Sequence, residues 1–328
     1  MRPIATEGAR LMKLLSYGVR GGVRPAALLA SDDESLGIVD LRECAHALDS
    51  RLDPADFKRL AKARDVGEVA GVSRAGMQQL AKFLASRSVA QYRKTIPRAR
   101  LLAPIATPRR NIFCVGRNYL EHVREGDLKR GIQTPIPEHP QFFTKPPSAV
   151  IGDGAAIEVE PQVSTQIDYE VELGVVIGHP VRNIGVSEAM SSVLGFTIIN
   201  DVTARDLQRR HDQWFKGKGL DTFCPLGPWV VTADEIVDPH ALGLELRVNG
   251  ELRQSDTTAH MHFRIERLIA DLSRGMTLLP GDVIATGTPP GVGYAMTPPR
   301  FLMPGDEVRC SIEGIGSLSN TVRLRPQS

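Results

Sequence analysis

Long apolar runs and a dominant charge are both missing from this chain of 328 residues. No stretch approaches the roughly 18 apolar residues that a membrane span needs, and the first residues contain no continuous apolar segment of a signal peptide. Lys and Arg number 40 against 38 Asp and Glu, which leaves a formal net charge of only +2. We therefore expect a cytoplasmic protein that binds neither a membrane nor nucleic acid.

Motifs of several common enzyme classes are also absent. The four cysteines lie far apart without a CxxC pair, which argues against a zinc ribbon or a thioredoxin-like site and favours reduced, buried thiols. No GxSxG elbow occurs and no GxGxxG follows a strand. The Gly-rich run from Thr286 lacks the Gly-Lys-Ser/Thr ending of a phosphate-binding loop. Serine hydrolases, dinucleotide enzymes and P-loop proteins are therefore disfavoured.

The first hundred residues have the pattern of a small unit of strands followed by helices. Apolar runs separated by turn residues predict two or three short strands from Met12 to Asp40. Asp53-Pro54 has the form of a helix N-cap and first helical position, and a second helix is predicted after Ser73. The basic, proline-containing run from Arg93 is interpreted as a connector, so we place the domain boundary near residue 105.

The remaining residues, 106–328, predict strands separated by Pro and Gly turns with few helices. This pattern of strands and turns favours an antiparallel or mixed β core over a doubly wound sheet. One amphipathic helix is expected within residues 263–274, where apolar residues recur at helical spacing. The predicted fold class is therefore α+β, with a small N-terminal α+β domain at 1–105 and a larger domain at 106–328.

An acidic run lies at residues 166–173, where Asp168, Glu170 and Glu172 alternate with other residues. In a strand these three carboxylates share one face, and such a face is more often simply solvated. A further acid, Asp201, follows the apolar run GFTIIN, and an acid at the end of a buried strand needs a partner. Carboxylates converging from two strands would suit Mg²⁺ or Mn²⁺, whereas zinc is disfavoured because no His or Cys lies in register.

A histidine and a glutamate lie three residues apart in CVGRNYLEHVREG, on one face of a short predicted helix. Glu125 can hold one imidazole nitrogen of His122 and leave the other to accept a proton from water, although ordinary surface pairs share this spacing. The proline-rich residues 131–140 have the composition of a mobile cover over a site. The pair His260 and His262 is interpreted as a capping or surface feature.

Two lysines lie in unusual surroundings. Lys145 lies in FFTKPPSAV, and Lys218 lies in the Gly-rich run WFKGKGLDTFCPLGP. Flanking glycines permit close backbone approach to a ligand, so Lys218 is the preferred partner for a developing oxyanion; the alternative for both is a solvated side chain. Thr288, in TGTPPGVG, is interpreted as part of a rigid loop that offers its hydroxyl to a small ligand.

Six stretches of the second domain occur, in the same order, in a known family. They are VGRNYLEHVREG, FFTKPPSAVIG, DYEVELGVVIG, GFTIINDVTARDLQ, WFKGKGLDTFCPLGP and PGDVIATGTPPGVG. On these stretches, residues 105 to 328 resemble the fumarylacetoacetate hydrolase family. The resemblance implies a mixed β-roll with peripheral helices and a homodimer. The first hundred residues resemble the family's smaller N-terminal domain less distinctly.

The resemblance also implies roles for individual residues and reverses the interpretation of the acidic run and of the His-Glu pair. It implies a divalent cation, Mg²⁺ or Mn²⁺, held by Glu170, Glu172 and Asp201, with Asp168 as an adjacent acid that need not bind it. The other implied positions are the catalytic His122 with its orienting Glu125, the active-site Lys218, and the substrate contacts Arg117, Gln208 and Thr288.

The implied function is metal-dependent hydrolysis of a carbon–carbon bond in a small dicarbonyl acid, a 2,4-dioxo acid of the acylpyruvate or fumarylpyruvate type. His122 would deprotonate the attacking water, and a pyruvate enolate would leave. Two related reactions stay open: decarboxylation of a β-keto acid such as oxaloacetate, and isomerisation of a substrate similar to 2-hydroxyhepta-2,4-diene-1,7-dioate. A further alternative is a non-catalytic, ligand-binding member of the fold.

Overall fold

A sheet of 12 strands runs through the molecule, and its main path follows the order β4-β3-β2-β1-β14-β12-β11-β17-β6-β7. The computed structural model describes residues 12–326, so the first eleven residues of the predicted N-terminal domain lie outside the described part. The strands on the path are β4 Arg93–Pro97, β3 Ser35–Asp40, β2 Gly22–Ser31, β1 Lys13–Val19, β14 Cys224–Thr232, β12 Val193–Asn200, β11 Val171–Ile177, β17 Val283–Ala285, β6 Ile112–Gly116 and β7 Gln141–Lys145. Off the path, β5 (Leu101–Leu102) pairs with β1, and β8 (Val150–Ile151) pairs with β14.

The N-terminal unit is an antiparallel meander of β1, β2 and β3 followed by short helices, as the sequence predicts. Its helices are α1 Leu41–Ala47, α2 Pro54–Lys62, α3 Val66–Val69 and α4 Arg74–Ala85. The Asp53 side chain caps α2 by accepting from the N–H groups of Ala55 and Asp56 at 2.8 and 3.1 Å. Ser73 caps α4, so both predicted helix starts are confirmed.

The connector predicted from Arg93 is wrong in part, because it contains two strands. β4 pairs antiparallel with β3 at the sheet edge, and β5 pairs with β1. Within β4 only Ile96 is buried, so this edge strand presents polar residues almost throughout and has the composition of a loop. Strand pairing here depends on the neighbour β3, which a local sequence pattern does not reveal.

The sheet is continuous across the predicted boundary at residue 105. Strand β1 pairs with β14 through Lys13 with Val231 and Leu14 with Val230. The segment between β5 and β6, which contains residue 105, has no strand of its own. The division at this position stays a prediction.

A second sheet of five strands covers one side of the larger part. Its order is β16-β15-β18-β19-β9, with bounds Glu251–Thr257, Gly243–Val248, Glu307–Ile312, Gly316–Leu324 and Ala156–Val159. Side chains from both sheets share one apolar core, in which Leu173 and Phe196 of the large sheet cluster with Leu246 and Leu318. The predicted helix within 263–274 is present as α9, Ile265–Ser273. The mixed α+β fold is confirmed.

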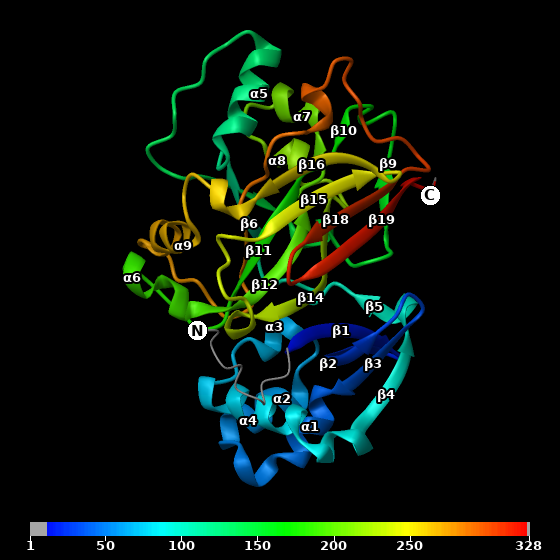
Figure 1. Ribbon diagram of the computed structural model, residues 1–328, viewed down its shortest axis with the longest axis vertical. Helices are drawn as coiled ribbons and strands as arrows, with labels where there is room; N and C mark the ends of the chain where they lie inside the picture. Colours follow the sequence, from blue (N-terminus) through cyan, green and yellow to red (C-terminus); the bar gives the residue numbers. More distant parts are fainter. Residues whose placement is uncertain (1–11, 327–328) are drawn as a thin grey trace, which may run out of the picture.

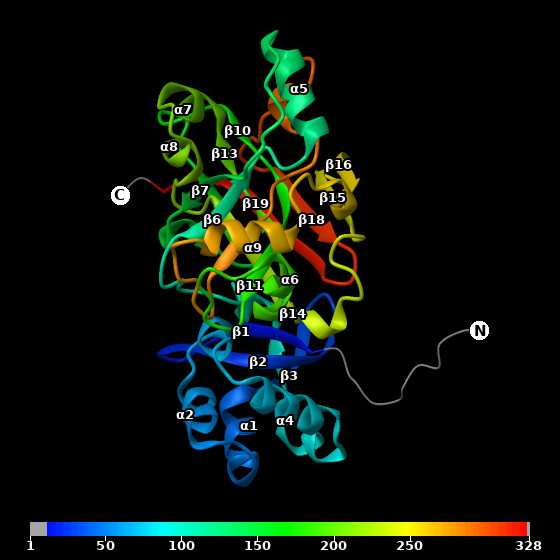
Figure 2. The same ribbon diagram turned by 90° about the vertical axis from the view of Figure 1, so that its left-hand side faces the viewer.

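Helices α5 (Leu120–Arg130), α7 (Arg205–Arg210) and α8 (Phe215–Lys218) lie at the end of the molecule opposite the N-terminal unit (Figures 1 and 2). The start of β11 lies at this end beside the end of β12, because the two strands are antiparallel neighbours. A small two-stranded ladder of β10 (Ile167–Asp168) and β13 (Thr203–Ala204) lies next to them. Side chains at these strand ends therefore converge beneath the three helices.

Candidate metal centre and active site

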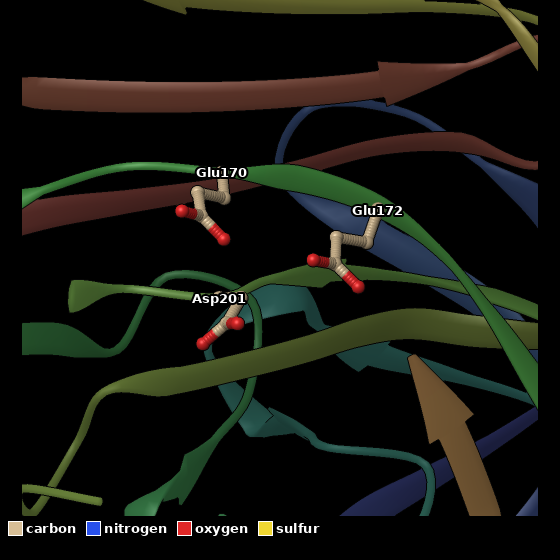
Figure 3. Close-up of side chains that lie close together, drawn as sticks. All are labelled: Glu170, Glu172 and Asp201. Atoms are coloured by element: carbon tan, nitrogen blue, oxygen red, sulfur yellow. The ribbon is translucent and has the colours of Figure 1, made fainter. Parts of the chain in front are cut away.

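Three carboxylates point toward one another at the junction of β11 and β12 (Figure 3). Val171 pairs with Asn200, and the Asp201 N–H donates to the Glu170 carbonyl at 2.8 Å, which fixes the two strand ends side by side. One ligand atom from each of Glu170, Glu172 and Asp201 lies within 4.8 Å of the others. All three residues are buried, with at most 4% exposed. The structure thus brings the three predicted metal ligands together.

The acidic run is not one regular strand. The β ladder is interrupted at Tyr169 and Glu170, between β10 and β11, and the acidic face is buried rather than solvated. Asp168 turns to the Gly293 N–H at 2.8 Å, the Tyr294 N–H at 3.0 Å and the Arg205 Nε at 2.9 Å. Asp168 therefore anchors a loop and an arginine, and it is not part of the three-carboxylate cluster.

Two buried lysines neutralise part of the cluster. Lys218 Nζ lies 2.7 Å from Glu170 Oε2 and 2.6 Å from Asp201 Oδ2. Lys145 Nζ lies 2.5 Å from Asp201 Oδ1 and donates to the Val202 carbonyl at 2.9 Å. The alternative of a solvated side chain is wrong for both lysines, because both are buried and contact Asp201.

Arg205 is a further member that sequence reasoning missed. Its Nη2 lies 2.7 Å from Glu170 Oε1, and its Nε bonds Asp168. It lies in the matched stretch GFTIINDVTARDLQ, directly before Asp206, where an Arg-Asp pair has the pattern of ordinary surface charge. Its burial, with 4% exposed, distinguishes it, and burial follows only from the packing of α7.

The electrostatic environment separates the two glutamates. Burial alone would raise the pKa of Glu170, but Lys218 and Arg205 lower it to about 2. Burial raises the pKa of Glu172 well above its ordinary value, and the charges of Asp201 and Glu170 raise it further. Glu172 accepts the Gly287 N–H at 2.8 Å, but no ion pair joins it to a cationic side chain within residues 12–326.

This donor set fits a divalent cation with oxygen ligands. Four buried carboxylates, with Asp168 included, face three cationic side chains, and Glu172 is the carboxylate left without one. A buried anion of this kind is costly unless it is paired or binds a metal. Glu170, Glu172 and Asp201 would hold the cation, and hard oxygen ligands of this type suit Mg²⁺ or Mn²⁺.

The predicted His-Glu pair is formed at the start of α5. His122 Nδ1 lies 2.8 Å from Glu125 Oε1, and the other carboxylate oxygen accepts the Gly291 N–H at 2.9 Å. Both oxygens of Glu125 are thus engaged, so the imidazole is held in one orientation. Nε2 is the nitrogen left to exchange a proton with a ligand.

A pocket of about 690 Å³ joins these groups. Of the nine predicted site residues, Glu125 and Asp201 lie behind its wall, and the seven that line it are Arg117, His122, Glu170, Glu172, Gln208, Lys218 and Thr288. The wall also includes Arg205, Arg209 and Trp214. The cationic side chains at this wall favour an anionic ligand.

The pair His260 and His262 and the four cysteines are not part of the carboxylate cluster. His260 is exposed and pairs with Asp256, and His262 contacts the Pro137 carbonyl at 3.0 Å, within the predicted cover segment. His260 agrees with the interpretation as a surface feature, whereas His262 is partly buried. All four cysteines are free and buried, as expected.

The comparisons with known proteins agree with this geometry. The family model described as "Fumarylacetoacetate (FAA) hydrolase C-terminal" matches residues 111–323. The chain belongs to the fumarylacetoacetate hydrolase family. The oxaloacetate tautomerase YisK of Bacillus subtilis is 49% identical over 228 residues, which cover 70% of this chain and 74% of that protein. The human mitochondrial oxaloacetate tautomerase FAHD2A is 46% identical over 243 residues, covering 73% and 75%.

Solved structures of the family are similar over almost the whole chain. The fumarylacetoacetate hydrolase of Exiguobacterium antarcticum has a TM-score of 0.75 at 37% identity, covering 96% of this chain and 100% of its own. The 2-hydroxyhepta-2,4-diene-1,7-dioate isomerase of Mycobacterium marinum has a TM-score of 0.68 at 31% identity, with the same coverage. The family is thus confirmed as an enzyme family. The hydrolase reaction is not confirmed, and the relatives' names agree better with the oxaloacetate and isomerase alternatives.

The described helices include none that is long and apolar enough to cross a membrane.

Proposed function

We propose that this protein interconverts the keto and enol forms of a 2-oxo dicarboxylic acid of the oxaloacetate type. The observation that carries the proposal is that a Glu-bound imidazole, His122, and a buried ammonium group, Lys218, line the same pocket as the carboxylate cluster. Such a pair of groups can move a proton between carbon and oxygen. The substrate class comes from the two tautomerases at 49% and 46% identity.

The pKa of Lys218 decides which of the two groups can act as the base. Burial alone would lower the pKa of Lys218, but Asp201 and Glu170 raise it above its ordinary value, so Lys218 stays an ammonium ion. It can donate a hydrogen bond to the C2 oxygen but cannot accept a proton. His122 Nε2 is therefore the group that takes the proton from C3 on enolisation and returns it on ketonisation.

Negative charge develops on the C2 oxygen when the C3 proton leaves. Lys218, which is buried, would face this charge, and an oriented ammonium group is most effective where water is excluded. A divalent cation held by Glu170, Glu172 and Asp201 would supply a Lewis acid that polarises the 2-oxo group. His122 then passes this proton to the C2 oxygen, so the enol forms and the imidazole is neutral again, and ketonisation runs the same two transfers in reverse.

Arg117 is the proposed partner of the second carboxylate. It has a left-handed backbone with φ of 58°, and its guanidinium lies 5.7 Å from the Trp214 ring centroid. A Cβ on the preceding Gly116 would lie 2.2 Å from the Trp214 ring, so the indole packs directly on this turn. No hydrogen bond or ion pair engages the Arg117 guanidinium within the described residues, which leaves it available to an anionic ligand.

Replacing Arg117 should therefore separate diacids from monoacids. For Arg117→Met we expect KM for oxaloacetate to rise about 10- to 100-fold, the value of a charge-assisted hydrogen bond. Enolisation of pyruvate, followed as deuterium incorporation at C3, should change little because pyruvate has no second carboxylate. Arg209→Met is the control, since Arg209 also lines the pocket but bonds Gln166. Equal losses for both acids would assign Arg117 to another role.

The reaction itself is tested with a panel of substrates. Oxaloacetate, an acylpyruvate and a hydroxydienedioate are each followed by loss of enol absorbance and by release of pyruvate. The proposal expects rapid enol loss from oxaloacetate without pyruvate. Pyruvate from oxaloacetate would indicate decarboxylation, and pyruvate from the acylpyruvate would indicate hydrolysis.

Hydrolysis is retained as the second candidate for a specific reason. The His122–Glu125 pair that moves a proton to carbon can also activate a water, and the hydrolase of Exiguobacterium antarcticum is 37% identical. The panel decides between the two. The homodimer and the cytoplasmic location stay predictions, and light scattering on the purified chain tests the former.

A further inference from the structure

A buried glutamine lies behind the pocket wall. Gln254, on β16, is 1% exposed. Its Oε1 accepts the Val171 N–H at 3.0 Å, and its Nε2 donates to Thr288 Oγ1 at 2.9 Å and to the Pro289 carbonyl at 2.8 Å. The amide orientation is fixed by chemistry, because the Val171 N–H only donates and the Pro289 carbonyl only accepts. Both N–H donors of Gln254 are thus used on the loop that carries Thr288.

Val171 is held at both of its backbone polar groups. Its N–H donates to Gln254, and its carbonyl accepts from Thr288 Oγ1 at 2.9 Å. Val171 stands between Glu170 and Glu172 in the chain. Three hydrogen bonds therefore form a closed ring that joins the loop to the strand segment bearing two of the clustered carboxylates.

The ring decides which hydrogen-bonding role Thr288 has toward the pocket. A threonine hydroxyl has one proton and two lone pairs. Here the proton is donated to Val171 and one lone pair accepts from Gln254, which leaves a single lone pair. A ligand group that binds this oxygen must donate a hydrogen bond, as the hydroxyl of an enol does and a carboxylate does not.

Strand β16, which carries Gln254, also contacts the loop at Gly291. This glycine has φ of 107°, and a Cβ on it would lie 2.1 Å from the carbonyl oxygen of Arg253, the residue before Gln254. The Gly291 N–H donates to Glu125, which holds His122. Strand β16 thus contacts the loop at two points, at the Thr288 hydroxyl and at Gly291, whose N–H holds the His-Glu pair.

We propose that Gln254 is a positioning residue. It fixes Thr288 as a hydrogen-bond acceptor for the enol hydroxyl of the substrate, and it holds the loop 288–291 on which the orientation of Glu125 depends. The identity of the substrate rests on the proposed function, whereas the placement of the loop does not. A purely structural glutamine would affect stability alone and leave kcat of the folded protein unchanged.

Gln254→Glu is the sharpest variant, because it has nearly the same shape and keeps an acceptor for Val171 but loses both donors. We expect kcat for conversion of enol to keto oxaloacetate to fall about tenfold or more, with the affinity for Mn²⁺ within about threefold of wild type. Gln78→Glu makes the same change on the exposed face of α4 and should have wild-type kcat. Wild-type kcat in folded Gln254→Glu would overturn the proposal.

A double-mutant cycle tests whether Gln254 acts through Thr288. Adding Gln254→Glu to Thr288→Val should lower kcat by a smaller factor than Gln254→Glu lowers it alone, because the hydroxyl that Gln254 orients is already gone and only its effect on the loop 288–291 remains. If the double variant lowers kcat by the product of the two single effects, the result would contradict action through Thr288.

Hydrogen exchange gives a readout that is independent of turnover and of the folding of the glutamate variant. In Gln254→Leu, which is uncharged, the Val171 and Gly291 amides should exchange faster while the amides of β16 keep their protection. Unchanged exchange at both amides would overturn the proposal. Wild-type protein that fails to tautomerise oxaloacetate would contradict the proposed function, and the exchange result would still decide the role of Gln254.

Discussion

Glu172→Gln is expected to abolish metal-dependent turnover while making the metal-free protein more stable. The substitution keeps the shape of the side chain and an acceptor for the Gly287 N–H, which lies 2.8 Å from the carboxylate. It removes the one cluster carboxylate that no cationic side chain pairs within residues 12–326. Lewis-acid stabilisation is worth several kcal/mol, so we expect kcat to fall by about 10³-fold or more.

The stability effect has the opposite sign because burial and the neighbouring carboxylates raise the pKa of Glu172. An acid whose folded pKa is raised costs nothing below its unfolded pKa, near 4.5, and costs more as pH rises above it. The Tm of metal-free Glu172→Gln should therefore exceed that of wild type, and by more at pH 8 than at pH 5.

Calorimetry with and without Mn²⁺ measures the stability of the metal-free protein and the stability gained on Mn²⁺ binding. Wild type should gain stability as Mn²⁺ is added, by about 2.7 kcal/mol at a hundred times the Kd, whereas Glu172→Gln should gain much less. Glu188→Gln makes the same change at an exposed position on the surface and should follow wild type. Full activity in wild-type protein from which a chelator has removed the metal would contradict the metal requirement.

Helix starts could be predicted from the sequence, because the residues that determine them are close together in the chain. The helix caps formed by Asp53 and Ser73 depend on neighbours within a few residues. Strand β4 was missed because only Ile96 is buried in it and its pairing with β3 spans about sixty residues. Sequence patterns report burial on one face, and an edge strand has little of it.

The residues of the site could be predicted from the sequence, but the ion pairs that surround the three carboxylates could not. The resemblance supplied Glu170, Glu172 and Asp201, and the antiparallel register of β11 and β12 explains why they meet. Spacing alone favoured a solvated acidic face, because burial of that face depends on α7, α8 and the loop after Thr286. Arg205 has no local signal, and the neighbours of Lys145 do not indicate its partner, since each becomes a partner of the acids only through contacts between distant segments.

His122→Ala is expected to lower kcat by roughly 10²- to 10⁴-fold, the usual contribution of a general base, while Mn²⁺ binding is retained. Retention follows from the geometry, because His122 lies on α5 and the three carboxylates lie on the strand ends beneath it. The loss should appear equally in ketonisation and in deuterium exchange at C3, since one proton transfer limits both. Glu125→Gln should lose less, because it still accepts a hydrogen bond from the imidazole.

A matched surface pair separates this role from a general effect of removing a histidine. His260 pairs with Asp256 at 2.5 Å, as His122 pairs with Glu125, but His260 is exposed and does not line the pocket. His260→Ala should therefore keep wild-type kcat. If His122→Ala also kept it, Lys218 could not take over, because Asp201 and Glu170 raise its pKa and hold it protonated. A water would then have to carry the proton. This result would contradict tautomerisation by His122 but would leave the proposed metal site unaffected.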